Sequence, residues 1–242
     1  MDTLFLVWLF IVGTVFGSFF GVVGSRLSEG KSIIKPRSHC NYCNHILKWY
    51  ELIPVFSYII QRGKCKNCNK TLSLFYPIIE LLSGFLFAVC YFCFGFTVEF
   101  FIAILIVSFL VIVIVSDLTY LIIPDEVTIF FSVAVIIVKL LAFGIKATLF
   151  SILSGILMFS LMYIIMLLGN KIFKKETLGG ADIKLMFFVG LILQPSLALF
   201  NIFLSACLAL PVSIVSLIKN KNNVIPFGPF ILMAVFLIFC FY

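Results

Sequence analysis

The sequence predicts an all-α membrane protein that crosses the bilayer about eight times, with one small soluble segment between its first two helices. Two observations carry this prediction. Of the 242 residues, 63% are hydrophobic and only 11% are charged, which leaves too little polar surface to cover a soluble fold. The hydrophobic residues also gather in long runs that short polar or basic stretches separate. We therefore expect a polytopic helical protein.

Seven apolar runs approach the length of transmembrane helices, which need about 20 residues to cross about 30 Å of hydrocarbon. An eighth run, Ile183–Leu193, is shorter and ends at Gln194-Pro195. It is either a short tilted span or a re-entrant helix, and counting it as a span gives eight. The seven longer runs are Leu4–Gly24, Pro77–Gly95, Phe100–Ser116, Val127–Phe143, Leu149–Gly169, Leu197–Leu217 and Val224–Tyr242.

The positive charges predict the orientation. With the amino terminus outside, eight spans place four loops in the cytosol, namely 25–76, 117–126, 170–184 and 218–223. These loops hold fifteen of the seventeen Lys and Arg residues, and only Lys139 and Lys146 fall toward the other side. Cytosolic loops of membrane proteins carry such an excess of positive charge. We therefore attribute the formal charge of +7 to the orientation of the chain in the membrane and expect no nucleic-acid partner. The first run has no basic segment before it, so we expect it to remain as a signal anchor.

The first span carries a row of small residues. Gly13, Gly17 and Gly21 are spaced four apart, and Ser18 and Gly24 extend the row. Small residues allow a second helix to approach closely in a membrane. We expect this face to pack against a neighbouring helix.

The loop between the first two spans contains two C-x-x-C pairs, with twenty-one residues between them. Four thiolates at this spacing complete a closed tetrahedral zinc site. The alternatives are two disulfides or unconnected thiols, but the cytosol is reducing. A loop of about fifty residues buries little core, so zinc would supply much of its folding free energy. The expected ligands are Cys40, Cys43, Cys65 and Cys68. His39 and His45 beside the first pair are alternative ligands, but four cysteines suffice, so we expect both histidines at the surface.

Two acidic residues in and near this loop are further candidates. Glu51 is the single acid of the apolar, aromatic stretch Leu47–Tyr58, which either packs on the membrane interface or shapes a small-molecule pocket. Glu80 lies about one turn into the second span, where an unpaired acid is costly. It is either a functional group or a boundary acid that reaches for water or a loop cation.

Two aspartates at the ends of apolar runs are the catalytic candidates. Asp117 closes one run, and Asp182 follows Gly179-Gly180-Ala181 at the start of another. The two glycines allow the backbone to approach a facing helix or a bound extended peptide. Pro124 disfavours helix before it, so Asp125 becomes a first-turn acid that its helix dipole stabilises. Asp117 has no such stabilisation at the carboxyl end of its helix, and we choose it as the reactive acid.

Two carboxylates brought close together cannot both ionise easily, so one keeps a proton while the other acts as a base. This pair activates water and protonates a leaving group, as in aspartic proteases. No Ser, Cys and His set competes for a nucleophilic role, because both histidines lie beside the cysteine pairs. Two other functions remain open: an ion or proton carrier, whose acids would be spread through the membrane depth, and a non-enzymatic assembly factor that does not need the aspartates.

Taken together, these motifs resemble those of the type IV prepilin peptidase family, which are intramembrane aspartic proteases of the GxGD class. The resemblance covers nearly the whole chain. It rests on Gly17-Ser18-Phe19, both C-x-x-C pairs, Glu51-Leu52-Ile53-Pro54, Tyr76-Pro77 with Glu80-Leu81-Leu82, Asp117 through Pro124-Asp125, and Gly179 through Leu185. Two positions depart from the family pattern: Ala181 stands where a glycine is usual, and Gly21 stands where an asparagine is common.

The resemblance implies that Asp117 and Asp182 are the catalytic pair. It further implies cleavage of a short basic leader, after a glycine, from prepilins or pseudopilins at the cytosolic face of a bacterial inner membrane. Many members also methylate the new amino terminus with S-adenosylmethionine, an activity associated with the zinc-bearing loop. The expected supporting residues are Gly179, Gly180, Lys184, Asp125, Glu80 and Glu51. We expect three parts: helix 1–25, zinc loop 26–76 and peptidase domain 77–242.

Overall fold

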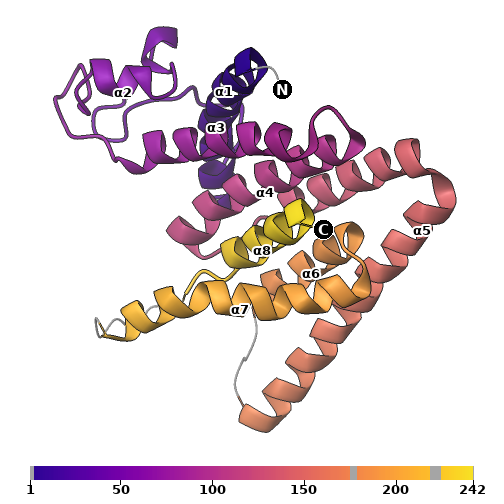
Figure 1. The fold of residues 1–242 in the computed structure, drawn as a ribbon. Coiled ribbons are helices and arrows are strands. Elements are labelled where there is room, and N and C mark those ends of the chain that lie inside the picture. Colours follow the sequence, from indigo (N-terminus) through magenta and orange to yellow (C-terminus); the bar gives the residue numbers. More distant parts are fainter. Residues whose placement is uncertain (1–2, 175–178, 219–224, 242) are drawn as a thin grey trace. The chain divides into compact units, whose positions relative to one another are not determined.

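The structure is a computed structural model that describes residues 3–174, 179–218 and 225–241. All regular elements in these ranges are helices, accompanied by two isolated β-bridges, so the prediction of an all-helical protein is confirmed. The chain forms two compact units, Met1–Phe96 and Thr97–Tyr242. Figure 1 shows their helices in chain order. The predicted domain boundary at residue 77 stays a prediction.

Within the described part of the chain, five helices are long and apolar enough to cross a membrane, so the chain is a multi-pass membrane protein. One of them, α5, has 49 residues and contains Gly144 at φ +75° and ψ 178°. This conformation is accessible to glycine and breaks the helix into two arms, 125–143 and 145–173, which Figure 1 shows turning back at the break. The two spans predicted here are these arms. The five helices are α1 (Thr3–Ser28), α3 (Phe75–Phe94), α4 (Val98–Tyr120), α5 (Asp125–Phe173) and α7 (Pro195–Ile218).

In the first unit, α1 and α3 pack through small residues. A Cβ atom added at Gly13 would lie 2.8 Å from the Gly84 Cα, and one at Gly17 would lie 2.7 Å from the Ser83 Cβ. The helices therefore touch at distances that no larger residue permits. The predicted packing role of Gly13 and Gly17 is confirmed. Gly21 differs, because a Cβ there would meet no described atom within 4 Å.

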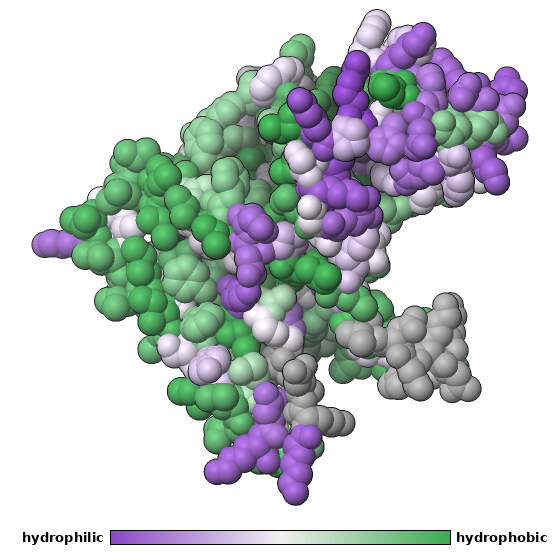
Figure 2. All heavy atoms as spheres, turned by 180° about the vertical axis from the view of Figure 1, so that it is seen from behind, coloured by the Kyte–Doolittle hydropathy of each residue, from purple (hydrophilic) through white to green (hydrophobic). Residues whose placement is uncertain are grey.

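The segment between α1 and α3 holds only short helices, η1 (Trp49–Glu51) and α2 (Phe56–Ile60). Hydrophilic side chains gather over it, with apolar side chains among them (Figure 2). Elsewhere the visible face is mostly hydrophobic, as expected for helices that face lipid.

In the second unit, α4 is the most buried of the long helices. Its Phe109 ring stacks on Phe131 at 5.1 Å between centroids and meets the Phe188 ring edge-on at 4.8 Å. The short helices α6 (Gly180–Ile192) and α8 (Gly228–Phe241) complete this core. A Cβ at Gly190 of α6 would lie 2.7 Å from the Gly155 Cα, so α6 and the second arm of α5 are also in backbone contact.

The helix ends near the expected site agree with the sequence in part. Pro124 precedes α5, and Asp125 is its first residue, as predicted. Helix α4 ends at Tyr120, three residues after Asp117, where Leu121 closes it in a left-handed conformation at φ +55°. The last predicted span began at Val224, which lies outside the described residues, and α8 begins at Gly228.

The carboxyl end of α6 is held by side chains from α5. The Lys139 ammonium donates to the Leu191 carbonyl at 2.6 Å and to the Ser151 hydroxyl at 3.0 Å. The Ser154 hydroxyl donates to the Leu193 carbonyl at 3.3 Å. These donors satisfy carbonyls that a helix end leaves without partners, and they fix α6 at the end opposite to Asp182.

Candidate functional site

Asp117 lies in the last turn of α4, and its side chain is buried in the second unit. The Gly228 backbone N–H donates to the Asp117 Oδ2 at 3.1 Å. Gly228 is the first residue of α8, so the carboxylate faces the positive end of a second helix. The positive end of α8 therefore offsets the unfavourable position of this carboxylate at the negative carboxyl end of α4.

Asp182 lies in the first turn of α6, and its backbone N–H donates to the Gly179 carbonyl at 3.1 Å. Its side chain is half-buried. Asp117 on α4 and Asp182 on α6 lie near enough for the charge of Asp117 to act on the Asp182 carboxylate. The carboxylates are 65 positions apart in sequence and belong to one electrostatically interacting pair.

Gly228 was not among the residues predicted from the sequence. A Cβ at this position would lie 3.0 Å from the Asp117 Oδ2 and 2.7 Å from the Ile123 Cδ1. Only glycine leaves the carboxylate in place while presenting its N–H. The signal in the sequence is Pro229 directly after it, since proline is common in the first helical turn.

Two predicted supporting residues form an ion pair. The Lys184 ammonium on α6 donates to both carboxylate oxygens of Asp125 on α5, at 2.6 and 2.8 Å. Both side chains are exposed. Of the two predicted glycines, Gly179 is the residue before α6 and lies against Asp182: a Cβ there would be 3.3 Å from the Asp182 Oδ2. A Cβ at Gly180 would meet no described atom within 4 Å.

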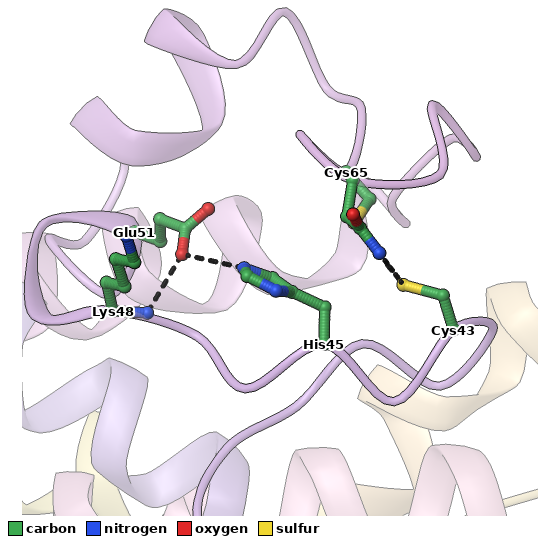
Figure 3. A network of polar contacts seen from close by, with 6 residues as sticks. Cys43, His45, Lys48, Glu51 and Cys65 are labelled. Atoms are coloured by element: carbon green, nitrogen blue, oxygen red, sulfur yellow. Dashed lines mark hydrogen bonds and ion pairs between the residues drawn. The ribbon is translucent and has the colours of Figure 1, made fainter.

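The other two supporting acids belong to the first unit and have separate partners. The Glu80 Oε2 accepts the Val55 backbone N–H at 2.7 Å. The Glu51 Oε2 accepts the Lys48 backbone N–H at 2.8 Å and lies 3.3 Å from the His45 Nε2 (Figure 3). The Lys48 hydrogen bond is the main cause that lowers the pKa of Glu51, and His45 adds to it. Glu51 is thus held as a carboxylate inside the loop.

The two C-x-x-C pairs are built as copies of one turn. In the first, the Cys40 N–H donates to the His45 carbonyl and the Asn44 N–H donates to the Cys40 carbonyl, both at 2.9 Å. In the second, Cys65, Asn69 and Lys70 repeat the same two bonds at the same distances. Asn44 and Asn69 have φ values of +54° and +56°, a region that asparagine tolerates well. Both asparagines directly follow a C-x-x-C pair, a repeat that the sequence analysis did not use.

The four sulfur atoms form a compact cluster, all within 4.8 Å of one another. The Cys40 and Cys68 Sγ atoms are 3.9 Å apart, and the Cys43 and Cys65 Sγ atoms are 4.0 Å apart. Zn–S bonds of about 2.3 Å in a tetrahedron place sulfur atoms about 3.8 Å apart, so the cluster fits zinc. All four cysteines are free thiols and form no disulfide bond.

One of the four thiols is prepared for deprotonation. The Asn67 side chain donates to the Cys43 Sγ at 3.5 Å. This hydrogen bond is the main cause that lowers the pKa of Cys43 to about 7, and the thiolate is the form that binds metal. The two neighbouring histidines have other partners: His45 faces Glu51, and the His39 Nδ1 lies 2.9 Å from the Arg37 carbonyl.

Comparisons with known proteins match both units. Residues 11–94 match the bacterial peptidase A24 N-terminal domain, and residues 104–214 match the type IV leader peptidase family. No solved structure matches this chain.

Three relatives are each named prepilin leader peptidase/N-methyltransferase. The Bacillus subtilis protein is 32% identical over 91% of this chain and 88% of its own length. The Myxococcus xanthus protein is 35% identical over 77% of this chain, and the match spans 56% of that longer protein. The Vibrio cholerae protein is 26% identical over 99% of this chain and 98% of its own length.

Proposed function

Because this chain belongs to the type IV leader peptidase family, we propose that it cleaves the leader peptide from type IV prepilins or pseudopilins and methylates the new amino terminus. The observation that carries the peptidase activity is the interacting pair of Asp117 and Asp182. The names of the relatives support both activities.

The two carboxyl groups act as base and acid on one peptide bond. The ionised carboxylate takes a proton from water as the water oxygen attacks the scissile carbonyl carbon. The protonated carboxyl group then gives its proton to the leaving nitrogen as the C–N bond breaks. Gly228 supports this chemistry because its N–H fixes one oxygen of Asp117. Gly179, against Asp182, supports it by leaving room for that carboxylate.

The proposed membrane arrangement has eight crossings and a cytosolic site. The five long helices, the second arm of α5, and the shorter α6 and α8 make eight. With this count, fifteen of the seventeen Lys and Arg residues lie in cytosolic loops, which the positive-inside rule favours. Asp117 and Asp182 then face the cytosol, where a leader of basic residues is available. The membrane is the bacterial inner membrane.

The four cysteines are proposed to hold one structural zinc ion. Cys40, Cys43, Cys65 and Cys68 would supply all four ligands, so no position stays open for water or substrate. Zinc bound in this way stabilises the fold of the loop. The Glu51 carboxylate contacts the Lys48 N–H and the His45 ring and so stabilises the turn that carries Cys40 and Cys43.

S-adenosylmethionine is the proposed methyl donor, because the relatives are named N-methyltransferases. Among the described residues, no glycine-rich turn follows a strand in the manner of nucleotide-binding folds. We therefore assign no residue to this cofactor and derive no step of methyl transfer.

The test is co-expression of the chain with a prepilin, followed by mass spectrometry of the prepilin amino terminus. Asp117→Asn and Asp182→Asn should each reduce leader removal by about 10²- to 10⁴-fold, the range that general acid–base groups contribute. Asp125→Asn is the matched control, because this exposed acid pairs with Lys184 on the helix that carries Asp182 and its loss should reduce cleavage by at most about five-fold. Normal cleavage by either of the first two variants, at parent expression levels, would refute the assigned pair.

A further inference from the structure

The α2 helix presents its apolar face outward. Phe56, Ile59 and Ile60 are 67%, 64% and 71% exposed, and residues spaced by three and four positions lie on one face of a helix. The opposite face points into the loop, where the Tyr58 hydroxyl donates to the Leu72 carbonyl at 3.3 Å. A soluble domain would turn this helix the other way.

A hydrogen bond to the membrane helix α3 fixes the position of α2 along that helix. The Val55 N–H, directly before α2, donates to the Glu80 Oε2 at 2.7 Å. Glu80 is the sixth residue of α3, about 8 Å along the helix from its start at a rise of about 1.5 Å per residue. Because α3 is long and apolar enough to span the membrane, α2 begins beside the first turns of a membrane helix and not out in the solvent.

The charge of the surrounding segment favours an anionic surface. Residues 29–74 contain eight Lys and Arg residues and two acids. Both acids have partners within the loop: Glu29 pairs with Lys31 at 2.5 Å, and Glu51 is buried against Lys48 and His45. Both ends of the segment continue into membrane helices, α1 and α3. These basic residues therefore belong to a segment that is tied to membrane helices at both ends.

We propose that α2 inserts the face formed by Phe56, Ile59 and Ile60 into the headgroup region of an anionic membrane surface and so fastens the 29–74 segment to the bilayer. Interfacial helices bury an apolar face about 5–10 Å into this region and use flanking basic residues to bind anionic lipids. Trp49, also exposed, adds an aromatic side chain of the type that membrane interfaces favour.

The test uses the full chain reconstituted in lipid nanodiscs. The chain has two tryptophans, Trp8 and Trp49, so Trp8→Phe with Trp49→Phe gives a background without tryptophan. In this background, Phe56→Trp is the helix reporter, which gives the position of α2. Tyr42→Trp is the matched turn reporter, because Tyr42 is comparably exposed at 65% but lies in the first cysteine turn with Lys70 over its ring.

In nanodiscs that contain phosphatidylglycerol, lipids brominated near the headgroup end of the acyl chain should quench the helix reporter several-fold more than the turn reporter. Adding Ile59→Ser with Ile60→Ser, or replacing phosphatidylglycerol by phosphatidylcholine, should reduce this quenching. Two results would overturn the proposal. The first is equal quenching of the two reporters by aqueous iodide, which places α2 in water. The second is that neither quencher reaches the helix reporter, which indicates a protein cover. Equal lipid quenching in both lipid compositions would overturn the role of anionic lipid.

Discussion

The Lys184 ammonium contacts both carboxylate oxygens of Asp125, at 2.6 and 2.8 Å. These residues lie near the amino-terminal ends of α6 and α5. Lys184 is two positions after Asp182, so the ion pair ties the part of α6 that carries the proposed catalytic acid to a second helix. Because side chains two positions apart point to different faces of a helix, Lys184 acts from the side away from Asp182 and positions it.

Removing this ion pair should lower the kcat of leader removal by a small factor. Exposed ion pairs contribute about 0.2–1 kcal/mol, which corresponds to at most about a five-fold change. We expect Asp125→Asn, Lys184→Met and the double variant to show similar losses, because each removes the same interaction. Steady-state kinetics with a prepilin peptide should also show that added salt reduces the difference from the parent chain. Losses that multiply in the double variant would show that the two residues act separately.

Gly228→Ala should reduce cleavage without unfolding the second unit. The new methyl group would lie 3.0 Å from the Asp117 Oδ2, so the carboxylate must move by a few tenths of an ångström. Since misplacement by about 1 Å costs about 10²-fold in rate, we expect a loss of about three- to ten-fold in kcat. The thermal unfolding curve should stay close to that of the parent chain, because the other two close atoms are terminal side-chain carbons, the Ile123 Cδ1 at 2.7 Å and the Val113 Cγ1 at 3.1 Å, and not backbone.

The control is the combination of Gly228→Ala with Asp117→Asn. If Gly228 acts through Asp117, adding Gly228→Ala to the Asp117→Asn variant should cause no further loss of cleavage. A further loss of the same size would assign Gly228 a different role.

The sequence was sufficient to predict the long helices and the cysteine cluster. Hydrophobic runs mark spans because every backbone group in lipid must be satisfied within its own helix. The spacing of Cys40, Cys43, Cys65 and Cys68 predicted the cluster because each short turn presents two thiols. The break at Gly144 also falls in the gap between two predicted spans.

The partners of the site residues depend on contacts that local patterns do not encode. The hydrogen bond from Gly228 to Asp117 joins positions 111 residues apart. The hydrogen bond from Val55 to Glu80 joins the loop segment before α2 to the membrane helix α3. Glu80 was left open between a functional group and a boundary acid, and the structure gives it a backbone partner. The end of α4 soon after Asp117 was expected, but its left-handed cap was not, because residues other than glycine, asparagine and aspartate seldom adopt the conformation of Leu121.

Cys40→Ser with Cys65→Ser should remove the bound metal. We expect about one zinc ion per chain in the parent protein, as one four-thiolate site holds one ion, and none in the variant. Loss of zinc should also expose the loop to proteolysis, because zinc binding supplies folding free energy of the order of 10 kcal/mol in small zinc domains. Elemental analysis by mass spectrometry and limited trypsin digestion measure the two effects.

Cys90→Ala with Cys93→Ala is the control for the metal prediction. These residues repeat the C-x-x-C spacing, but they lie within α3 and outside the sulfur cluster. Zinc content should therefore stay at the parent level. Retention of zinc by the Cys40 and Cys65 variant, or its absence from the parent chain, would contradict the site.

Gly17→Val should weaken the packing of α1 on α3. A Cβ at this position already lies 2.7 Å from the Ser83 Cβ and 3.0 Å from the Glu80 Cα, and the backbone atom cannot move without shifting the helix. Overpacking of this kind costs about 1–3 kcal/mol. We expect a matching decrease in the free energy of unfolding, measured by titration with a denaturing detergent in mixed micelles.

Gly21→Val provides the comparison on the same helix. A Cβ at Gly21 meets no described atom within 4 Å, so the added side chain has room, and the helix no longer bears the entropic cost of glycine, about 0.5–1 kcal/mol relative to alanine. The free energy of unfolding should therefore stay the same or rise slightly. Equal destabilisation by the two substitutions would mean that the loss comes from valine in a membrane helix and not from contact between α1 and α3.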